Sequence, residues 1–154
     1  MKVPQVVKDL RTDERRIAWG LTTDGLPLVA THTSLYAGTE RLAWIDVERV
    51  SWKPSTLTLT EVSETAGAGA RHSWELAQDG RLAETIRARV TSSIGWSDRR
   101  ALQPKGHVRL VGRRLPDTDA LRWQLVFEEG TDPQDANFRA QAEQLVEALR
   151  RTIG

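Results

Sequence analysis

The sequence contains no cysteine and no long apolar run among its 154 residues. Without thiols the chain has no disulfide framework, no cysteine nucleophile and no thiolate metal site. A membrane helix needs about 18 consecutive apolar residues, and no segment approaches that length. The N-terminal stretch MKVPQVVKDLRTDERR also lacks the apolar core of a signal peptide. We therefore expect a cytoplasmic protein with no membrane span, made of one domain or of one domain and a small appendage.

Lysine is scarce, with four Lys against 18 Arg. This excess of Arg is typical of a GC-rich bacterial genome, so most of the arginines need no functional explanation. The charges are unevenly distributed along the chain. Residues 81–114 carry nine positive and two negative side chains, whereas residues 1–80 and 115–154 have net charges of −2 and −4. The basic stretch is the one electrostatic feature that suggests a binding partner.

The short motifs of common enzyme classes are absent as well, including the GxSxG nucleophile elbow, the phosphate-binding loop, the GxGxxG turn and the HExxH pair. The three histidines, His32, His72 and His107, fall in three different predicted elements and show no metal-ligand spacing. Paired carboxylates lie in turns or at element ends, where they usually face water. We therefore predict that the protein is not an enzyme and holds no metal or cofactor.

Short alternating runs separated by turn residues extend over residues 14–77 and predict seven β-strands. The pair Asp24-Gly25 is suited to a tight hairpin turn, because glycine accepts a positive φ. Apolar residues spaced three apart over residues 44–50 predict a bent turn between two strands. The period then changes to that of an amphipathic helix, for which Asp79 is the expected N-cap. The apolar face of this helix contains Leu82, Ile86, Val90 and Ile94.

Seven short antiparallel strands followed by one amphipathic helix resemble the pleckstrin-homology (PH) superfold. The passage RLAWIDVERV, residues 41–50, is similar to a strand–turn–strand passage common in bacterial PH-like proteins, which agrees with the GC-rich, actinobacterial-type composition. The resemblance covers residues 12–94 and implies a seven-stranded antiparallel β-barrel or sandwich closed by one helix. A lipocalin-like or other small barrel is the alternative.

The last third of the chain predicts a β-hairpin and a helix. Residues 106–115 and 121–129 both alternate, and a polar turn joins them. In the final helix, Asp132 is expected to cap the N-terminus and Pro133 to occupy the first helical position. One hairpin and one helix bury too little apolar surface to be stable alone, so we expect them to pack on another domain.

The predicted fold class is therefore α+β, with three parts. A PH-like domain is expected over residues 1–94, and a basic linker over residues 95–105. The β-hairpin and the C-terminal helix are expected over residues 106–154, packed on the first domain.

Trp96 and the arginines of the basic stretch are the candidate binding residues. Trp96 follows the predicted helix within the linker, beside Arg99 and Arg100. A half-exposed indole next to guanidinium groups is suited to a binding hot spot. The alternative is that Trp96 packs the C-terminal appendage onto the first domain. The candidate surface further includes Arg87, Arg109 and Arg113, for which a solvated face is the alternative.

The PH resemblance implies binding of either phosphoinositides or proteins. Family members that bind inositol phosphates use several basic residues around the first hairpin loop, but residues 22–25 (TTDG) carry none here. We therefore expect no phosphoinositide ligand. The predicted function is a non-enzymatic adaptor that binds a protein partner or a second copy of itself. The alternative is a nucleic-acid-associated protein that uses the Arg-rich stretch 81–114.

Overall fold

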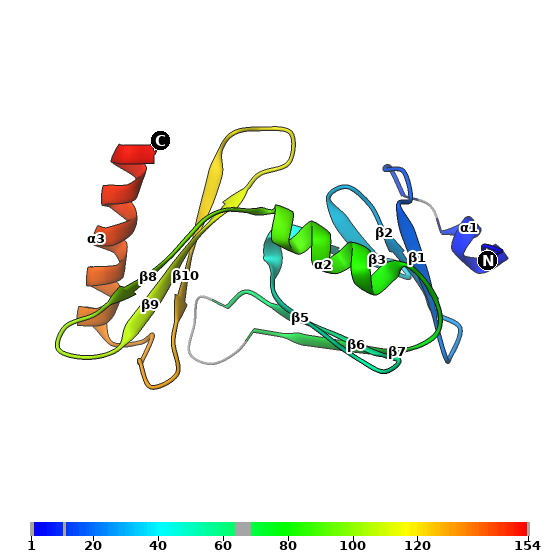
Figure 1. Ribbon diagram of the computed structural model, residues 1–154, viewed down its shortest axis with the longest axis horizontal. Coiled ribbons are helices and arrows are strands. Elements are labelled where there is room, and N and C mark those ends of the chain that lie inside the picture. Colours follow the sequence, from blue (N-terminus) through cyan, green and yellow to red (C-terminus); the bar gives the residue numbers. More distant parts are fainter. Residues whose placement is uncertain (1, 11, 64–68, 154) are drawn as a thin grey trace. The chain divides into compact units, whose positions relative to one another are not determined.

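The computed structural model describes residues 2–10, 12–63 and 69–153, which form two compact units (Figure 1). The first unit comprises the described residues up to 61 together with residues 70–92, and the described residues from 93 onward make up most of the second. Each unit has its own β-sheet and its own buried apolar core.

The first unit is a curled seven-stranded antiparallel sheet that forms a half-barrel, followed by helix α2. The sheet order is β4-β3-β2-β1-β7-β6-β5, so the two edge strands, β4 and β5, are consecutive in the chain. The expectation of seven antiparallel strands followed by a helix is confirmed. Its elements after the N-terminal segment are β1 (Ala18–Thr22), β2 (Pro27–Ala30), β3 (Ser34–Ala37), β4 (Glu40–Ala43), the 3-10 turn η1 (Trp44–Asp46), β5 (Val47–Lys53), β6 (Thr56–Glu61), β7 (Arg71–Gly80) and α2 (Leu82–Ser92).

Two local features of the half-barrel follow directly from the sequence. Gly25 has a φ of 90° in the turn between β1 and β2, as the Asp-Gly pair predicts. The predicted bent turn is η1, where the indole N–H of Trp44 donates to the carbonyl of Thr31 at 2.9 Å. Trp44 is buried, so this hydrogen bond satisfies a donor that water cannot reach.

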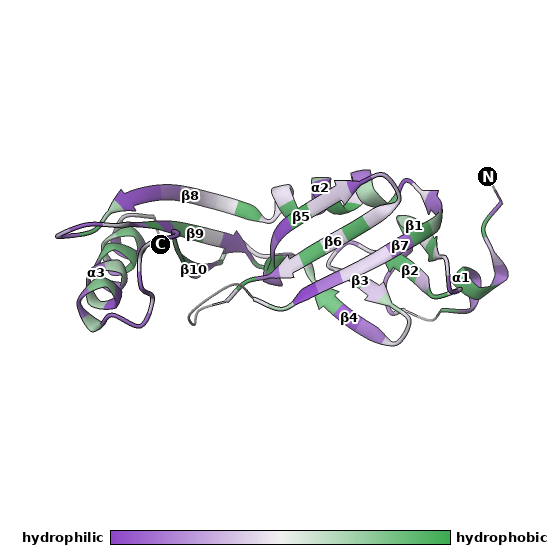
Figure 2. Ribbon diagram, turned by 90° about the horizontal axis from the view of Figure 1, so that it is seen from below, coloured by the Kyte–Doolittle hydropathy of each residue, from purple (hydrophilic) through white to green (hydrophobic). Residues whose placement is uncertain are grey.

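Helix α2 supplies one wall of the apolar core of the half-barrel. Its side chains Leu82, Ile86 and Val90 are buried in the same cluster as residues of β2, β3, β5 and β6. Figure 2 shows the alternation of apolar and polar positions along β6 that places Leu57 and Leu59 in this core. Asp79 accepts a hydrogen bond from the backbone N–H of Leu82 and thus caps α2, as predicted.

The sequence pattern gave no sign of helix α1 (Gln5–Asp9), which is only five residues long. It is held by Val7, which is fully buried against Trp19 and Val29 in a small apolar cluster separate from the main core of the half-barrel. The sheet therefore buries apolar side chains on both of its faces near β1 and β2.

The second unit is a three-stranded antiparallel sheet with one helix. Its elements are β8 (Ile94–Ala101), β9 (His107–Arg114), β10 (Leu121–Phe127) and α3 (Ala136–Ile153), with the strand order β10-β9-β8. Val108 and Leu110 of β9 pack against Phe138, Ala142 and Val146 of α3. The predicted hairpin and C-terminal helix are confirmed.

Three details in or next to the second unit differ from the sequence prediction. Most of the expected linker 95–105 is strand β8, which already begins at Ile94. Helix α2 ends at Ser92, so Ile94 is not part of its apolar stripe and is 39% exposed. The N-cap of α3 is Asp135 and not Asp132, because the Asp135 carboxylate accepts hydrogen bonds from the backbone N–H groups of the first turn.

In the part of the chain that the structure describes, every helix is too short or too polar to cross a membrane.

Candidate binding surface

Strand β8 is an exposed edge of the second unit. It pairs with β9 through a register that runs from Ile94 opposite Arg113 to Ala101 opposite His107, with a bulge between Ile94 and Trp96. Only β9 pairs with β8 in the strand order, so the other side of β8 has no strand neighbour within this sheet. Most side chains of β8 are exposed. The strand therefore offers both backbone groups and side chains to a partner.

The two faces of this sheet carry different side chains. Residues opposite each other on neighbouring strands share a face. Trp96, Asp98 and Arg100 lie opposite Gly112, Leu110 and Val108, and they share the face that α3 packs on. On the other face are Ser97, Arg99 and Ala101.

Trp96 lies on a row of three residues that runs across the sheet. Gly112 of β9 is opposite Trp96 on one side and opposite Trp123 of β10 on the other. A Cβ atom placed on Gly112 would meet the Trp123 ring at 3.3 Å, so the ring lies over the glycine. Trp123 belongs to the apolar core beneath α3, whereas Trp96 is 39% exposed. The indole of Trp96 is thus a large apolar group at the edge of a packed surface.

The charged side chains of β8 are paired on both faces. Arg100 Nε donates to Asp98 Oδ2 at 2.6 Å on the Trp96 face. On the other face the Arg99 guanidinium makes two hydrogen bonds to the Glu128 carboxylate, at 2.6 and 2.8 Å. Arg100 lowers the pKa of Asp98, and Arg99 lowers the pKa of Glu128, through these charge-assisted hydrogen bonds. Both pairs are therefore ionised at neutral pH.

The five proposed residues that lie in the second unit do not share one surface. Trp96 and Arg100 share a face of β8, and Arg99 lies on the opposite face with Arg109, whose guanidinium donates to Ser97 Oγ at 3.1 Å. Arg113 is only 2% exposed, so it is a structural residue and not a surface one. Arg87 is exposed on α2 and belongs to the first unit.

Asp98 and Glu128 complete the surface, although neither was among the residues predicted from the sequence. Asp98 is one of two acidic residues in the basic stretch, and it stands two positions before Arg100. This spacing places both side chains on one face of a strand. The spacing of Asp98 and Arg100 can be interpreted in this way only when residues 94–101 are known to form a strand. Glu128 directly follows β10 and is distant from Arg99 in the sequence, so no local pattern links the two residues.

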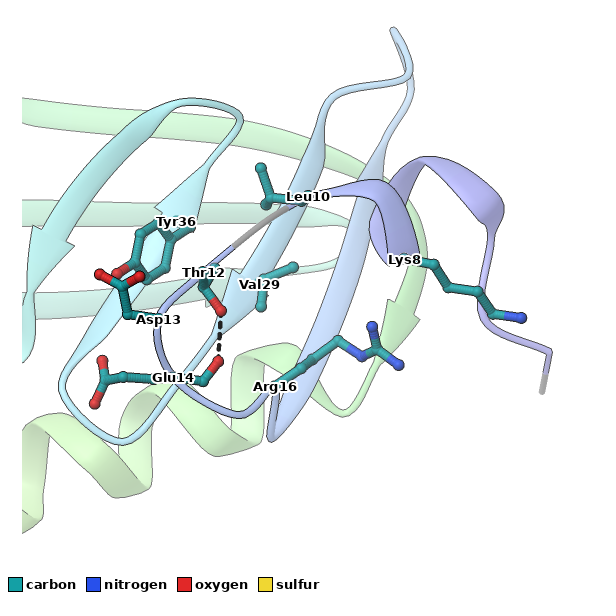
Figure 3. A pocket seen from close by; sticks show the side chains of 8 residues that line it. All are labelled: Lys8, Leu10, Thr12, Asp13, Glu14, Arg16, Val29 and Tyr36. Atoms are coloured by element: carbon teal, nitrogen blue, oxygen red, sulfur yellow. Dashed lines mark hydrogen bonds between the residues drawn. The ribbon is translucent and has the colours of Figure 1, made fainter.

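An open pocket of about 620 Å³ lies near the N-terminal segment of the first unit (Figure 3). Val29 and Tyr36 contribute to its lining, and Glu14 accepts hydrogen bonds from the hydroxyls of Thr31 and Thr33. Its charged side chains are separated: Figure 3 shows Lys8 and Arg16 toward α1, and Asp13 with Glu14 on the other side. These groups do not converge on one point as a catalytic acid and base would.

A second pocket of the half-barrel contains a hydrogen-bonded pair of side chains. His72 Nε2 lies 2.8 Å from Glu61 Oε2, and the His72 ring stacks on Trp74 with a centroid distance of 5.9 Å. The pocket measures only about 90 Å³, which leaves room for very few ligand atoms. Among the residues that the structure describes, no three His, Asp or Glu side chains are grouped so as to hold a metal ion.

Comparison of the chain with protein-family models, with curated protein sequences and with solved structures found no match.

Proposed function

We propose that this chain is a non-enzymatic protein-binding module that uses β8 as an edge strand to pair with an extended segment of its partner. The proposal rests on the combined features of β8. It is an edge strand of eight residues, it carries the exposed Trp96, and its charged side chains are already paired with other side chains. Strand addition gains affinity from backbone hydrogen bonds and specificity from alternate side chains.

The backbone of β8 has donors and acceptors available on its free side. The N–H of Leu102 donates to the carbonyl of Gly106 at 2.8 Å, on the β9 side. Backbone groups of successive strand residues point to opposite sides, so those of Ser97, Arg99 and Ala101 point away from β9. These three residues are the hydrogen-bonding positions for an added strand.

The side chains of β8 favour a protein partner over a highly charged polymer. Exposed edge strands are usually protected by unpaired charges, especially lysine, that repel another strand. Here Asp98 neutralises Arg100, and Glu128 neutralises Arg99. Trp96 supplies the aromatic anchor that protein interfaces favour.

A PH-like identity of the first unit is part of the same proposal. Its support is the element order of the half-barrel, in which seven antiparallel strands precede α2, together with the bent turn η1 between β4 and β5. We further propose a cytoplasmic adaptor role. The first hairpin turn, Thr22–Gly25, carries no basic side chain, which argues against a phosphoinositide ligand.

The nucleic-acid alternative has weaker support. Arg113 is buried, and the guanidinium of Arg99 is occupied by Glu128, so two of the arginines counted in the basic stretch do not contribute free positive charge. Nucleic-acid binding depends on unneutralised cations that replace counterions on phosphates. Arg109 and Arg114 remain exposed on β9.

A pull-down from a bacterial cell extract tests the proposal with three variants of the tagged chain. Ala101→Pro removes one outward N–H, Trp96→Ala removes the anchor, and Asp119→Arg is a control charge change in the exposed β9–β10 turn. We expect the wild type and the control to retain a protein after nuclease treatment, either an untagged copy of this chain or a different protein, and both β8 variants to lose it. Circular dichroism verifies that each variant is folded.

Two results would contradict the proposal. Equal retention of the protein by the wild type and by both β8 variants would exclude β8 as the binding strand. Recovery of nucleic acid, with steep loss of binding as salt is raised, would favour the Arg-rich stretch instead.

A further inference from the structure

The charges on the Trp96 face of β8 match those of a second β8 strand running in the opposite direction. We infer that two copies of this chain associate through β8, about a two-fold axis at Arg99, with Asp98 of each copy facing Arg100 of the other. This inference rests on the edge-strand function proposed above and names a second copy as the partner. The inference specifies one alignment, or register, of the two β8 strands, which is determined by the side chains of β8.

Symmetry restricts the registers that two β8 strands can adopt. A two-fold axis perpendicular to the sheet keeps each face on its own side, so only residues of the same face lie opposite each other. The axis must then pass midway between the two copies of one residue, which lie opposite each other; we name each register by that residue. With the axis at Arg99, the outward backbone groups of Ser97 meet those of Ala101 in the second copy, and the two Arg99 backbones meet each other.

Charge selects among the registers that symmetry allows. An axis through Asp98 places two carboxylates opposite each other, and an axis through Arg100 places two guanidinium groups opposite each other; both arrangements are repulsive. An axis through Ser97 leaves Asp98 opposite the indole of Trp96. Only the axis through Arg99 gives opposite-charge pairs, and by symmetry it gives two of them.

The opposite face of the sheet tolerates this register. Two Arg99 side chains lie opposite each other there, but each is bound by Glu128 of its own chain through hydrogen bonds of 2.6 and 2.8 Å. The four groups together carry no net charge. Their neighbours along the strand, Ser97 and Ala101, are small, so the two Arg99 side chains are the largest groups that β8 places on this face.

The register also gives the exposed indole of Trp96 a partner. Diagonal neighbours across an antiparallel pair lie about 7–8 Å apart, which long and aromatic side chains can bridge. Arg100 of the second copy is the diagonal neighbour of Trp96, and a guanidinium group is favourably placed over an indole face. The resulting interface uses the same residues from both copies, closes after two chains and leaves neither β8 as a free edge.

Sedimentation equilibrium of the purified full chain tests the inference through charge reversal. We expect the wild type to have the mass of two chains. Asp98→Arg and Arg100→Asp each convert both opposite-charge pairs into like-charge pairs, so each variant alone should dissociate about tenfold to a hundredfold more readily. The control Asp119→Arg should behave as the wild type does, because Asp119 is exposed in the β9–β10 turn.

Two combinations of these variants show whether the single variants dissociate because of like-charge pairs or because of a general loss of stability. An equimolar mixture of the Asp98→Arg and Arg100→Asp chains restores both opposite-charge pairs and should recover the mass of two chains. The double variant D98R/R100D should also recover it, because the two charges are exchanged. Added salt should weaken both the wild-type and the restored dimers.

A wild type that stays at the mass of one chain up to about millimolar concentration would overturn the inference. Single variants that remain dimeric, or a mixture that stays monomeric, would overturn the register. A chain that stays monomeric leaves the edge-strand function open to a separate test, because the pull-down detects a different protein bound to β8. If the β8 variants lose that protein while their mass equals that of the wild type, only the inference of self-association is wrong.

Discussion

The Arg113 guanidinium of β9 donates to the side-chain oxygen of Gln124 on β10 at 3.1 Å, and both residues are only 2% exposed. A second hydrogen bond of 2.7 Å joins Arg113 to Ser93 Oγ. An arginine in this position is part of the internal structure of the second unit. Its hydrogen bonds replace the water that the buried guanidinium has lost.

Replacement of Arg113 by alanine should destabilise the second unit by about 2–4 kcal/mol, because Gln124 and Ser93 lose a buried partner. The measurement is urea denaturation monitored by circular dichroism. Arg109→Ala is the matched control on the same face of β9, where the side chain is exposed, and it should cost less than about 0.5 kcal/mol. Equal effects of the two changes would contradict a structural role for Arg113.

The stability that Glu14 contributes should disappear at acidic pH. Partial burial opposes ionisation of Glu14, but hydrogen bonds from Thr33 and Thr31 outweigh it and hold the pKa of the carboxyl below its ordinary value of 4.5. A lowered pKa means that ionised Glu14 stabilises the folded state above pH 4.5, and that this stability is lost as the pH falls through the lowered pKa.

The test compares the wild type with Glu14→Gln across pH. We expect the variant to be less stable by about 1 kcal/mol at pH 7, with the difference shrinking as the pH falls below 4.5. Asp13→Asn is the control at the neighbouring exposed carboxyl. A difference that stays constant with pH would show that the Glu14 charge makes no contribution.

The cap of helix α2 should be measurable in the first unit. Asp79→Ala removes the side-chain acceptor for the Leu82 N–H and should cost about 1 kcal/mol. Asp79→Asn keeps an oxygen in the same place and should cost clearly less. Thermal unfolding of the two variants separates the lost hydrogen bond from other effects of the substitution, and equal melting temperatures would refute the cap.

Gly80 should not tolerate a side chain. A Cβ atom there would lie 2.4 Å from the ring of Trp19, which is itself buried. We expect Gly80→Ala to destabilise the half-barrel by about 1–3 kcal/mol, since the rigid indole must move. A double-mutant cycle with Trp19→Leu measures the coupling: the alanine should cost much less once the ring is gone. Additive effects would argue against this clash.

The half-barrel could be predicted because its turns carry strong local signals. The pair Asp24-Gly25 indicates one hairpin, and the change of period after Asp79 marks the start of α2. Strand β8 could not be predicted in the same way. An edge strand with both faces exposed has no alternation to read, so residues 94–101 resemble a polar linker.

The candidate surface was predictable in part. Exposure of Trp96 was one of two readings that its position allowed, and the structure has the indole 39% exposed. Arg109 and Arg113 share one face of β9, as residues four positions apart on a strand do. Their burial differs because Arg113 is covered within the second unit while Arg109 is not, and only the three-dimensional arrangement contains that information.

The strand order of the half-barrel has a consequence for how the first unit folds. Among its described strands, every pairing joins consecutive strands except that of β1 with β7, which brings Gly20 opposite Asp79. The local hairpins can form independently, but this one pairing requires closure of a loop that contains nearly the whole sheet. The folding rate of the half-barrel is therefore governed by a single long-range encounter. Substitutions at β1 and β7 should slow folding, and those at β3 and β4 should mainly speed unfolding.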